Sequence, residues 1–238
     1  MEKRKEGIKE FWKKIWNEHA ESKNMFVQIG RSSYTPLEFF LMVKDISNAL
    51  KFEKNDIVLD AGGGAAWISI AISPFAGKIY LFDYADKMME KAKENIKHFD
   101  NIIEAYVDDI EFMGKTKGLG IAFDKIIISS VLQYFSSYDS IRKILRNIFE
   151  VLKNNGKAIV THNPNIAKKK AHIKSYHCLN WDSKRIQKAL EMEEKRFWMD
   201  IKKIKEIASK IGFTKCCEVP INSNLWQSTH MFDFLLQK

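Results

Sequence analysis

The feature that most constrains the fold is a short apolar segment that runs almost directly into a group of glycines. Residues 57–59 have the composition of a buried strand, and the three glycines 62–64 follow within a few positions. Residues 65–75 then have the apolar content of a helix. Glycine suits such a turn because it adopts backbone angles that a Cβ atom disfavours and lets a ligand approach the main chain. An ordinary tight turn needs glycines too, so the rest of the chain has to decide between these interpretations.

Strands and helices alternate on either side of this turn. Buried strands are expected at residues 57–59, 78–82, 102–107, 123–129 and 157–161. Helices are expected at residues 65–75, 86–99, 139–152 and 200–211, and two final strands at 214–219 and 229–236. Such alternation predicts an α/β fold with a doubly wound, seven-stranded, mostly parallel sheet of the Rossmann-like type. The last two strands are expected to form an antiparallel hairpin at its edge.

The residues before the turn predict an N-terminal helical part. Residues 6–20 place apolar side chains three and four positions apart, as on one face of an amphipathic helix. Thr35 and Pro36 are typical of the start of a second helix. Residues 26–31, between the two, are expected to be a loop or a short extended piece. The predicted parts are a helical cap or lid at residues 1–54, a ligand-binding Rossmann-like domain at residues 55–238 and, within it, an insertion at about 163–199 that contributes to the substrate site.

The residues around the glycines argue against a dinucleotide cofactor. A G-x-G-x-x-G fingerprint that began at Gly62 would need its third glycine at Trp67, where close packing is required. Asp60 stands just before the glycines, where its carboxylate would repel a pyrophosphate. The turn therefore suits a cationic, phosphate-free ligand better than NAD or FAD.

The segment from Asp60 to Gly64 resembles the D-x-G-x-G signature of class I S-adenosylmethionine-dependent methyltransferases, and in particular their small-molecule branch. The resemblance covers most of the chain after residue 56. Residues 123–133 resemble the fourth strand of that family and the segment after it. There are two departures, since Ala66 replaces the last glycine of the usual motif and Gln133 stands where many relatives have histidine. The resemblance implies a Rossmann-like methyltransferase fold with S-adenosylmethionine as the cofactor.

The resemblance also implies which residues bind the cofactor. Asp83 ends the second strand, where the family binds the ribose hydroxyls, and a carboxylate can accept two such hydrogen bonds. Asp109 and Ile110 follow the third strand, where the family holds the adenine, with Asp108 as the neighbouring alternative. Arg31 is expected either to pair with the carboxylate of the cofactor or to be a surface arginine. The full expected set is Asp60, Ala61, Gly62, Gly64, Asp83, Tyr84, Asp109, Ile110, Ser129 and Arg31.

The methyl acceptor is less closely defined by the sequence. A hydroxyl acceptor benefits from a general base, and His162 is expected directly after the fifth strand, at the edge where α/β sheets bind ligands. His162 is therefore the first candidate base, with Asn163 beside it to orient the acceptor, although a structural histidine is also compatible with the sequence. Gln133, Tyr34 and His172 are expected in the substrate site. We expect methylation of a hydroxyl of a sugar or natural-product intermediate, in small-molecule biosynthesis.

Other functions remain open. The formal net charge of +9 is compatible with an RNA or protein methyltransferase, although the lysines are spread along the chain, so nucleic acid is an unlikely partner. A Rossmann-type nucleotide-binding protein without methyl transfer is a further alternative. The cysteine and histidine spacing predicts no metal site.

Composition indicates where the protein works. No apolar run approaches the length of about 18 residues that a spanning helix needs, and the charged N-terminus does not resemble a secretory signal. We therefore expect a cytoplasmic protein without a membrane partner. A homodimer is possible, because the N-terminal helices have apolar faces.

Overall fold

One seven-stranded sheet organises the molecule in a computed structural model that describes residues 2–238, with side chains described from residue 7 onward. Met1, the first residue of the predicted cap, lies outside the described residues. The strands are β1 (Ile57–Ala61), β2 (Lys78–Asp83), β3 (Ile102–Val107), β4 (Phe123–Ser129), β5 (Leu152–Pro164), β6 (Lys215–Val219) and β7 (Met231–Gln237). The α-helices are α1 (Glu2–Ala20), α2 (Met25–Gln28), α3 (Pro36–Leu50), α4 (Trp67–Ile72), α5 (Asp86–Ile96), α6 (Gly114–Gly118), α7 (Tyr138–Val151), α8 (Lys169–Ser175), α9 (Ser183–Lys195) and α10 (Ile201–Ile211).

The order of the strands is β3-β2-β1-β4-β5-β7-β6, and this order creates the binding crevice. Strands β3, β2, β1, β4 and β5 pair in parallel, whereas β7 runs antiparallel to both β5 and β6. The chain leaves β1 toward β2 on one side and later returns to β4 on the other. In open sheets of this kind, ligands bind beyond the carboxyl ends of the strands at such a switch point. The predicted mostly parallel, seven-stranded Rossmann-like fold is confirmed. The predicted antiparallel pair at the edge consists of β6 and β7, and β6 is the outermost strand.

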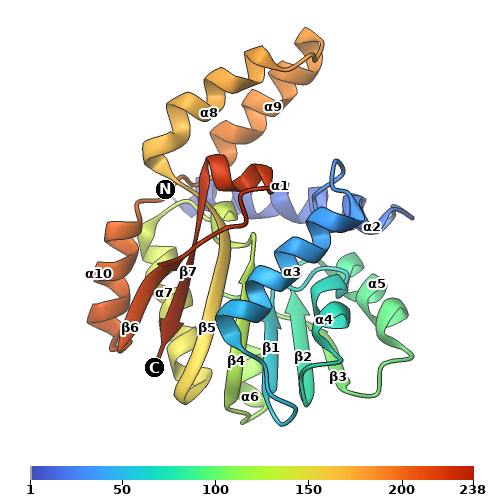
Figure 1. Cartoon of the computed structure of the whole chain (residues 1–238), viewed down its shortest axis with the longest axis vertical. Coiled ribbons are helices and arrows are strands. Elements are labelled where there is room, and N and C mark those ends of the chain that lie inside the picture. Colours follow the sequence, from blue (N-terminus) through green and yellow to red (C-terminus); the bar gives the residue numbers. More distant parts are fainter. Residues whose placement is uncertain (1) are drawn as a thin grey trace.

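Helices cover both faces of the sheet, as Figure 1 shows. Helices α3, α4 and α5 pack on one face through side chains such as Ile46, Ile72 and Met89, which are buried against Val58 and Ile79 of the sheet. Helices α7 and α10 pack on the other face, in a cluster that contains the alternate strand residues. The central strand β4 is buried on both sides at Ile126, Ile127 and Ile128, as its continuous apolar run predicts.

Local chemistry fixes the ends of the helices. Thr35 and Glu38 form a capping box at the start of α3, with Pro36 in its first turn, and α3 ends at a left-handed Lys51. Asp200 caps the start of α10, which ends at Gly212 with a φ of 115°. These caps agree with the helix boundaries that the sequence indicates.

Two predictions about local structure are wrong. Residues 26–31 were expected to be a loop or an extended piece, but Met25–Gln28 form α2, because the Asn24 side chain accepts a hydrogen bond from the Phe26 N–H and starts a helical turn. The fifth strand was expected to end at residue 161, but β5 continues to Pro164. The pairing of β5 with β7 shifts register between Val160 and Asn163, and the two strands stay paired beyond this irregularity as far as Pro164. His162 therefore lies within the strand rather than after it.

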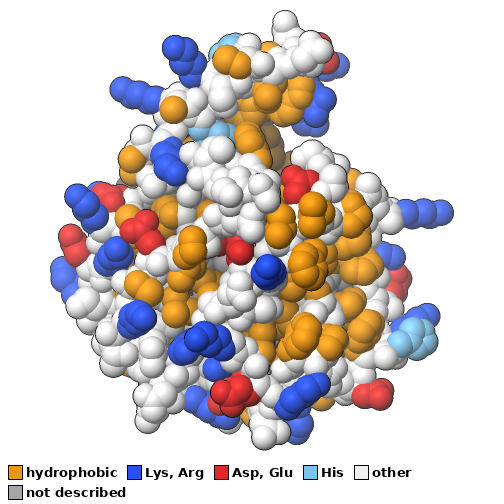
Figure 2. Space-filling view, viewed as in Figure 1, with side chains coloured by type: hydrophobic (Ala, Val, Ile, Leu, Met, Phe, Trp, Pro, Cys, Tyr) orange, Lys and Arg blue, Asp and Glu red, His pale blue; other side chains and the backbone are white. Residues whose placement is uncertain are grey.

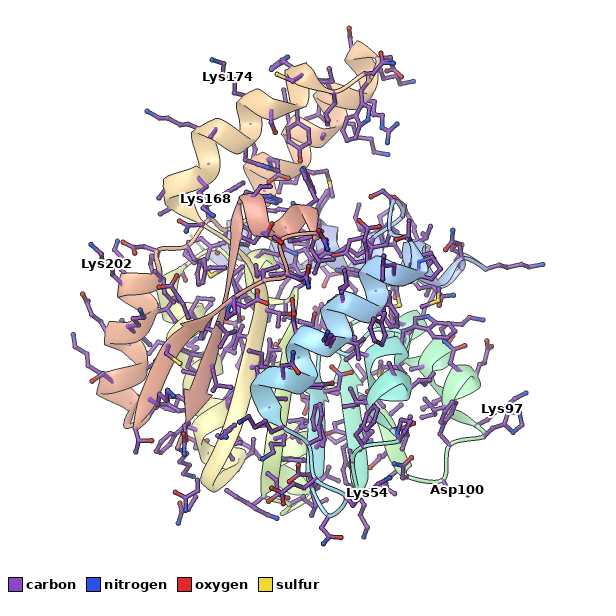
Figure 3. The ribbon with its side chains drawn as sticks, viewed as in Figure 1. Lys54, Lys97, Asp100, Lys168, Lys174 and Lys202 are labelled. Atoms are coloured by element: carbon purple, nitrogen blue, oxygen red, sulfur yellow. The ribbon has the colours of Figure 1, made fainter. Side chains whose placement is uncertain are left out.

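The expected insertion forms a helical arm, which we define as residues 166–195. It contains α8, α9 and two short 3₁₀ turns, and it projects beyond the carboxyl edge of the sheet (Figure 1). Lys174 extends from the arm away from the body, whereas Lys168 lies at the base of the arm, where its Nζ donates to the Ser228 carbonyl at 3.4 Å (Figure 3). Among the described helices, none is both long enough and apolar enough to cross a membrane. The division into a cap, a domain and an insertion stays a prediction.

The burial of Phe234 on β7 predicts a large contribution to stability. Its side chain is fully buried, so Phe234→Ala leaves a cavity and is expected to lower the free energy of unfolding by about 3–5 kcal/mol in urea denaturation. Phe75→Ala is the matched control, because Phe75 is 54% exposed and its loss is expected to change stability by less than about 0.5 kcal/mol. Equal effects of the two substitutions would contradict this packing.

Candidate cofactor and acceptor site

A cavity lies at the carboxyl ends of β1, β2, β3 and β4, beneath α1. Its floor and sides come from the last residues of these strands and the segments that follow them, namely Gly62–Ala65, Phe82–Ala85, Asp108–Ile110 and Ser129–Val131. Its roof and far end come from Lys9, Trp12, Lys13, Trp16, Gln28, Ile29, Arg31, Tyr134 and Phe135, with Met42 and Ile68 beside the glycines. Residues far apart in the sequence therefore enclose one site at the predicted edge of the sheet.

The glycine turn is held against the neighbouring strand by its own backbone. The N–H groups of Gly62 and Gly63 both donate to the carbonyl oxygen of Phe82, at 2.8 and 3.0 Å. Gly62 has a φ of 80°, and a Cβ atom at this position would lie 2.4 Å from a methyl group of Val131. Gly62 thus meets both requirements for glycine, because the left-handed backbone and the close approach each exclude a side chain.

Asp60 lies beneath the turn and does not line the cavity. It is buried, its Oδ2 accepts a hydrogen bond of 2.7 Å from the Ser69 hydroxyl, and the Cβ of a residue in place of Gly63 would lie 2.9 Å from its carboxyl group. Burial raises the pKa of Asp60 to about 6, and the negative charge of Asp83 adds to this rise. Asp60 and the equally buried Ala61 therefore support the turn from below, rather than forming the expected wall of the site.

Asp83 faces the cavity from the end of β2. Its Oδ2 accepts a hydrogen bond of 3.1 Å from the Gly64 N–H, and its Oδ1 accepts one of 2.9 Å from the Ala85 N–H. Burial raises the pKa of Asp83, although these backbone donors oppose the rise. The carboxylate keeps lone pairs for a ligand hydroxyl. Tyr84 beside it also lines the cavity, and its hydroxyl donates to Glu10 of α1 at 3.1 Å.

The acids after β3 connect the cavity to its roof. Lys9 Nζ of α1 lies 2.6 Å from Asp109 and 2.9 Å from Glu111. Burial lowers the pKa of Lys9, but the hydrogen bonds with these two carboxylates outweigh it and raise the pKa above its ordinary value. Asp108 instead accepts hydrogen bonds from the backbone and hydroxyl of Thr116. Asp108, Asp109 and Ile110 all line the cavity.

Arg31 lines the cavity near the end of β4. One of its terminal nitrogens donates to the Ser130 hydroxyl at 2.6 Å, and the guanidinium lies 5.7 Å from the ring centroid of Tyr34. Ser130 has a φ of 61°, which is unusual for a residue with a side chain, and its N–H is held by the Thr161 carbonyl at 3.0 Å. Such held strain is found at functional sites more often than elsewhere.

Two tryptophans of the N-terminal helix form an aromatic roof. Helical spacing is compatible with core packing or with closure over a ligand for Trp12 and Trp16, and in the structure both line the cavity, with ring centroids 4.5 and 5.7 Å from that of Tyr134. Lys9, Gln28 and their neighbours carry no local motif that would have placed them here. The one available signal was the concentration of aromatic residues on one face of the N-terminal helix.

Comparison with known proteins identifies the family. A family model described as a methyltransferase domain matches residues 52–210, which is more than half of the chain. The chain belongs to this family. It is a class I S-adenosylmethionine-dependent methyltransferase.

Solved structures share the fold of the methyltransferase over most of its length. Magnesium protoporphyrin IX methyltransferase from Synechocystis PCC 6803 aligns with a TM-score of 0.63 at 13% identity and covers 94% of this chain and 92% of its own. The N-methyltransferase NodS from Bradyrhizobium japonicum aligns with a TM-score of 0.64 at 11% identity, over 94% and 97%. Phosphoethanolamine N-methyltransferase 1 from Haemonchus contortus aligns with a TM-score of 0.67 at 16% identity, over 98% of this chain and 48% of its own.

One curated relative matches a shorter part of the methyltransferase. The probable cobalt-precorrin-6B C(15)-methyltransferase of Archaeoglobus fulgidus is 27% identical over 84 residues, which is 31% of this chain. The match spans about half the length of that relative, 50%.

The structure does not bring the expected catalytic residues of the methyltransferase to the cavity wall. His162 is buried, with its backbone N–H donating to Asp233 and its Nδ1 lying 3.4 Å from the Ser130 hydroxyl. Burial, together with the positive charge of Arg31, holds the pKa of His162 well below its usual range. Asn163 is also buried and donates to the Val160 and Phe232 carbonyls. Because β5 continues through these two residues and pairs with β7, both side chains are buried rather than exposed at the end of a strand.

The expected substrate residues also lie behind the cavity wall. Gln133 is buried and donates from Nε2 to the Ser130 carbonyl and the Tyr134 hydroxyl, each at 3.1 Å. Tyr34 is buried and donates to Gln227. His172 stacks on His230 at the base of the arm, with ring centroids 3.8 Å apart. Of the ten expected cofactor residues, those that line the cavity are Gly62, Gly64, Asp83, Tyr84, Asp109, Ile110, Ser129 and Arg31.

The contact between Gly62 and Val131 predicts how the turn tolerates change. Gly62→Ala forces Val131 toward the cavity and is expected to weaken the binding of S-adenosylhomocysteine at least about tenfold, as measured by calorimetry. Gly120→Ala is the matched control, because its φ is also positive, no atom lies within 4 Å of the new Cβ, and Gly120 does not line the cavity. Its affinity is expected to change less than about threefold. The same loss in both variants would mean that backbone strain alone, and not the contact, sets the affinity.

The buried acids predict a pH dependence of stability. Burial raises the pKa of Asp233 to about 7, above the value of about 3.9 for an unfolded chain. Between about pH 4 and pH 7 the native state keeps a proton that the unfolded state releases, so the free energy of unfolding falls as pH rises through this window. Asp233→Asn is expected to flatten this fall in urea denaturation at several pH values, with the surface variant Asp100→Asn as the control. An undiminished slope in Asp233→Asn would contradict the assignment.

Proposed function

We propose that this methyltransferase transfers a methyl group from S-adenosylmethionine to a hydroxyl of a small molecule, such as a sugar or natural-product intermediate. The observation that carries the proposal is the aromatic roof of the cavity. Trp12 and Trp16 on α1 meet Tyr134 above the proposed cofactor residues, so the site is enclosed on the scale of a small molecule. The names of the structural neighbours support small acceptors, since they include a porphyrin and phosphoethanolamine methyltransferase.

The chain's own residues fit the parts of the cofactor. Asp83 is proposed to accept hydrogen bonds from the ribose hydroxyls, and Ile110 to pack on the adenine beside Asp109. The glycine turn and Ser129 are proposed to contact the amino acid part, with Arg31 as the partner of its carboxylate. Tyr84 lies beside the ribose position, and Asp60 and Ala61 support the turn from below.

The mechanism asks mainly for alignment. The cofactor supplies a methyl group that is already activated on a sulfonium, so the protein has to hold a nucleophile in line and exclude water. The roof is suited to water exclusion, and the ion pair of Lys9 with Asp109 fixes α1 across the cavity. His162 is proposed to receive a proton only through the Ser130 hydroxyl, because Ser130 lines the cavity and His162 does not. Its lowered pKa makes it a weak base, so the proton is transferred only as the bond between oxygen and the methyl group forms. Asn163 is proposed to hold the backbone at this point, and Gln133, Tyr34 and His172 to support the acceptor end from behind.

The proposed homodimer is supported by an apolar surface on α3. Leu37 is 64% exposed and Phe40 is 61% exposed, and Figure 2 shows hydrophobic side chains gathered over this helix.

The alternative of an RNA or protein acceptor is supported by the net charge of +9 and by Lys168, Lys169 and Lys170 on the arm. A steep fall of RNA methylation with salt would favour that alternative.

Methylation of a compound panel tests the proposal. Purified protein, S-adenosylmethionine and pools of hydroxyl, amine and carbon-acid compounds are incubated, and products are identified by mass spectrometry. We expect O-methyl products, with kcat/KM at least about a hundredfold lower in Asp83→Ala because the ribose contact is lost. Asp100→Ala is the matched control, since Asp100 lies at the opposite end of the sheet (Figure 3). Methylation of amines, RNA or protein in place of hydroxyl compounds would overturn the proposal.

A further inference from the structure

Buried polar atoms without partners gather around Tyr134, which lines one end of the cavity; Trp12 and Arg31 line the cavity too, whereas Gln133 and Arg196 lie behind its wall. Among the described side chains, Trp12 Nε1 and Gln133 Oε1 have no hydrogen-bond partner, although Trp12 is only 5% exposed and Gln133 only 1%. The Nε atoms of Arg31 and Arg196 are also buried and without a partner within the described part of the chain. Leaving such groups unpaired costs stability, so their concentration beside a cavity indicates a place for a polar ligand.

These groups converge on the Tyr134 side chain from different elements. The Trp12 ring lies 4.5 Å from the Tyr134 ring, and Gln133 Nε2 donates to the Tyr134 hydroxyl at 3.1 Å. Residues that directly follow the arm reach the same place, because the Phe197 N–H donates to the Gln133 carbonyl at 2.8 Å. Arg196 immediately precedes Phe197, and its charge, like that of Arg31, acts on the Tyr134 hydroxyl.

The chemistry of this end is dominated by hydrogen-bond donors. Burial raises the pKa of Tyr134, so the phenol keeps its proton at neutral pH, while Arg196 and Arg31 favour negative charge nearby. In the described structure its hydroxyl accepts a bond from Gln133 and donates none. The Trp12 N–H and the two guanidinium groups can only donate. Such a set is complementary to an oxyanion, whose oxygens only accept.

A buried ion pair holds Arg196 in place. Its Nη1 lies 2.7 Å from Glu193 Oε1, which also accepts a hydrogen bond of 2.9 Å from Tyr176. His172 lies 3.6 Å from the same oxygen, so one carboxylate fixes the base of the arm. Since Glu193 uses one terminal nitrogen of Arg196, the remaining N–H groups of the guanidinium are left for another partner.

We propose that the Tyr134 end of the cavity binds an oxyanion of the methyl acceptor, through the Tyr134 hydroxyl, the Trp12 N–H and Arg196. The acceptor is then a hydroxyl compound that also carries a carboxylate or a phosphate. Arg31 faces the same end and serves the carboxylate of the cofactor, as proposed above. This inference rests on the proposed hydroxyl methylation and narrows its substrate class.

Binding to matched compound pairs tests the proposal without knowledge of the natural acceptor. The full chain, saturated with S-adenosylhomocysteine, is titrated by calorimetry with glucuronate and glucuronamide, salicylate and salicylamide, and glycerol 3-phosphate and glycerol. At least one anion is expected to bind about tenfold or more tightly than its neutral partner, and the pairs separate carboxylate from phosphate recognition. Equal binding within every pair, or no binding by any of the six, would overturn the proposal.

Variants assign the preference to this end of the cavity. Arg196→Gln is expected to remove the preference for the anion while the affinity for S-adenosylhomocysteine stays within about twofold. The single variant Arg196→Gln leaves the Glu193 carboxylate without its ion-pair partner. The double variant Arg196→Gln/Glu193→Gln therefore provides a comparison without a buried lone charge. Tyr134→Phe is expected to weaken the anion about tenfold. Arg185→Gln is the control, since Arg185 stacks on Trp181 elsewhere on the arm and is expected to keep the preference.

The outcomes separate this inference from the proposed function. An anion preference that survives in both Arg196 variants and in Tyr134→Phe would refute the site. Methylation of neutral hydroxyl compounds without any preference for anions would refute the site and leave hydroxyl methylation standing. An anion preference that depends on Arg196, together with methylation at nitrogen or carbon only, would support the site and refute hydroxyl methylation.

Discussion

The hydrogen bonds from the Gly62 and Gly63 N–H groups to the Phe82 carbonyl are the constraint on which the site depends. They fasten the end of β1 to the end of β2, so the turn and Asp83 face the same cavity. Gly62 allows this because its missing side chain admits Val131 from the segment that follows β4, the strand on the other side of β1. The buried Asp60 below the turn accepts from Ser69 of α4 and joins the turn to the helix that follows. The geometry of the cofactor site is thus set by contacts between the ends of three neighbouring strands, β2, β1 and β4, and the segments that follow them.

The N-terminal helix completes what the sheet begins. Lys9 bridges Asp109 and Glu111, and the tryptophans of the same helix lie against Tyr134 at the end of β4. One helix therefore contacts the segments that follow two different strands, and it separates the cavity from solvent on that side. The segment that directly follows the arm also lies near Tyr134, because the Phe197 N–H donates to the carbonyl of the neighbouring Gln133. Methyl transfer benefits from such enclosure because water competes with the acceptor for the aligned position.

The sequence predicts what depends on short-range pattern. The strands, the glycine turn and Asp83 follow from apolar runs, backbone requirements and the place of an acid at a strand end, and the structure agrees with these positions except for the extent of β5. The sequence does not predict contacts between distant residues, such as Lys9 with Asp109. Helical periodicity indicates that one face of a helix is buried, but not which segment packs against that face. His162 looked accessible because β5 was expected to stop before it. Only the pairing with β7, formed by the last residues of the chain, carries the strand onward and buries the side chain.

A crystal structure with bound S-adenosylhomocysteine tests the central claim most directly. The account predicts ribose hydroxyls on Asp83, adenine against Ile110, the amino acid carboxylate near Arg31 and a sulfur atom that faces the Tyr134 end of the cavity. A ligand bound outside this cavity, or one whose sulfur faces away from Tyr134, would contradict the account.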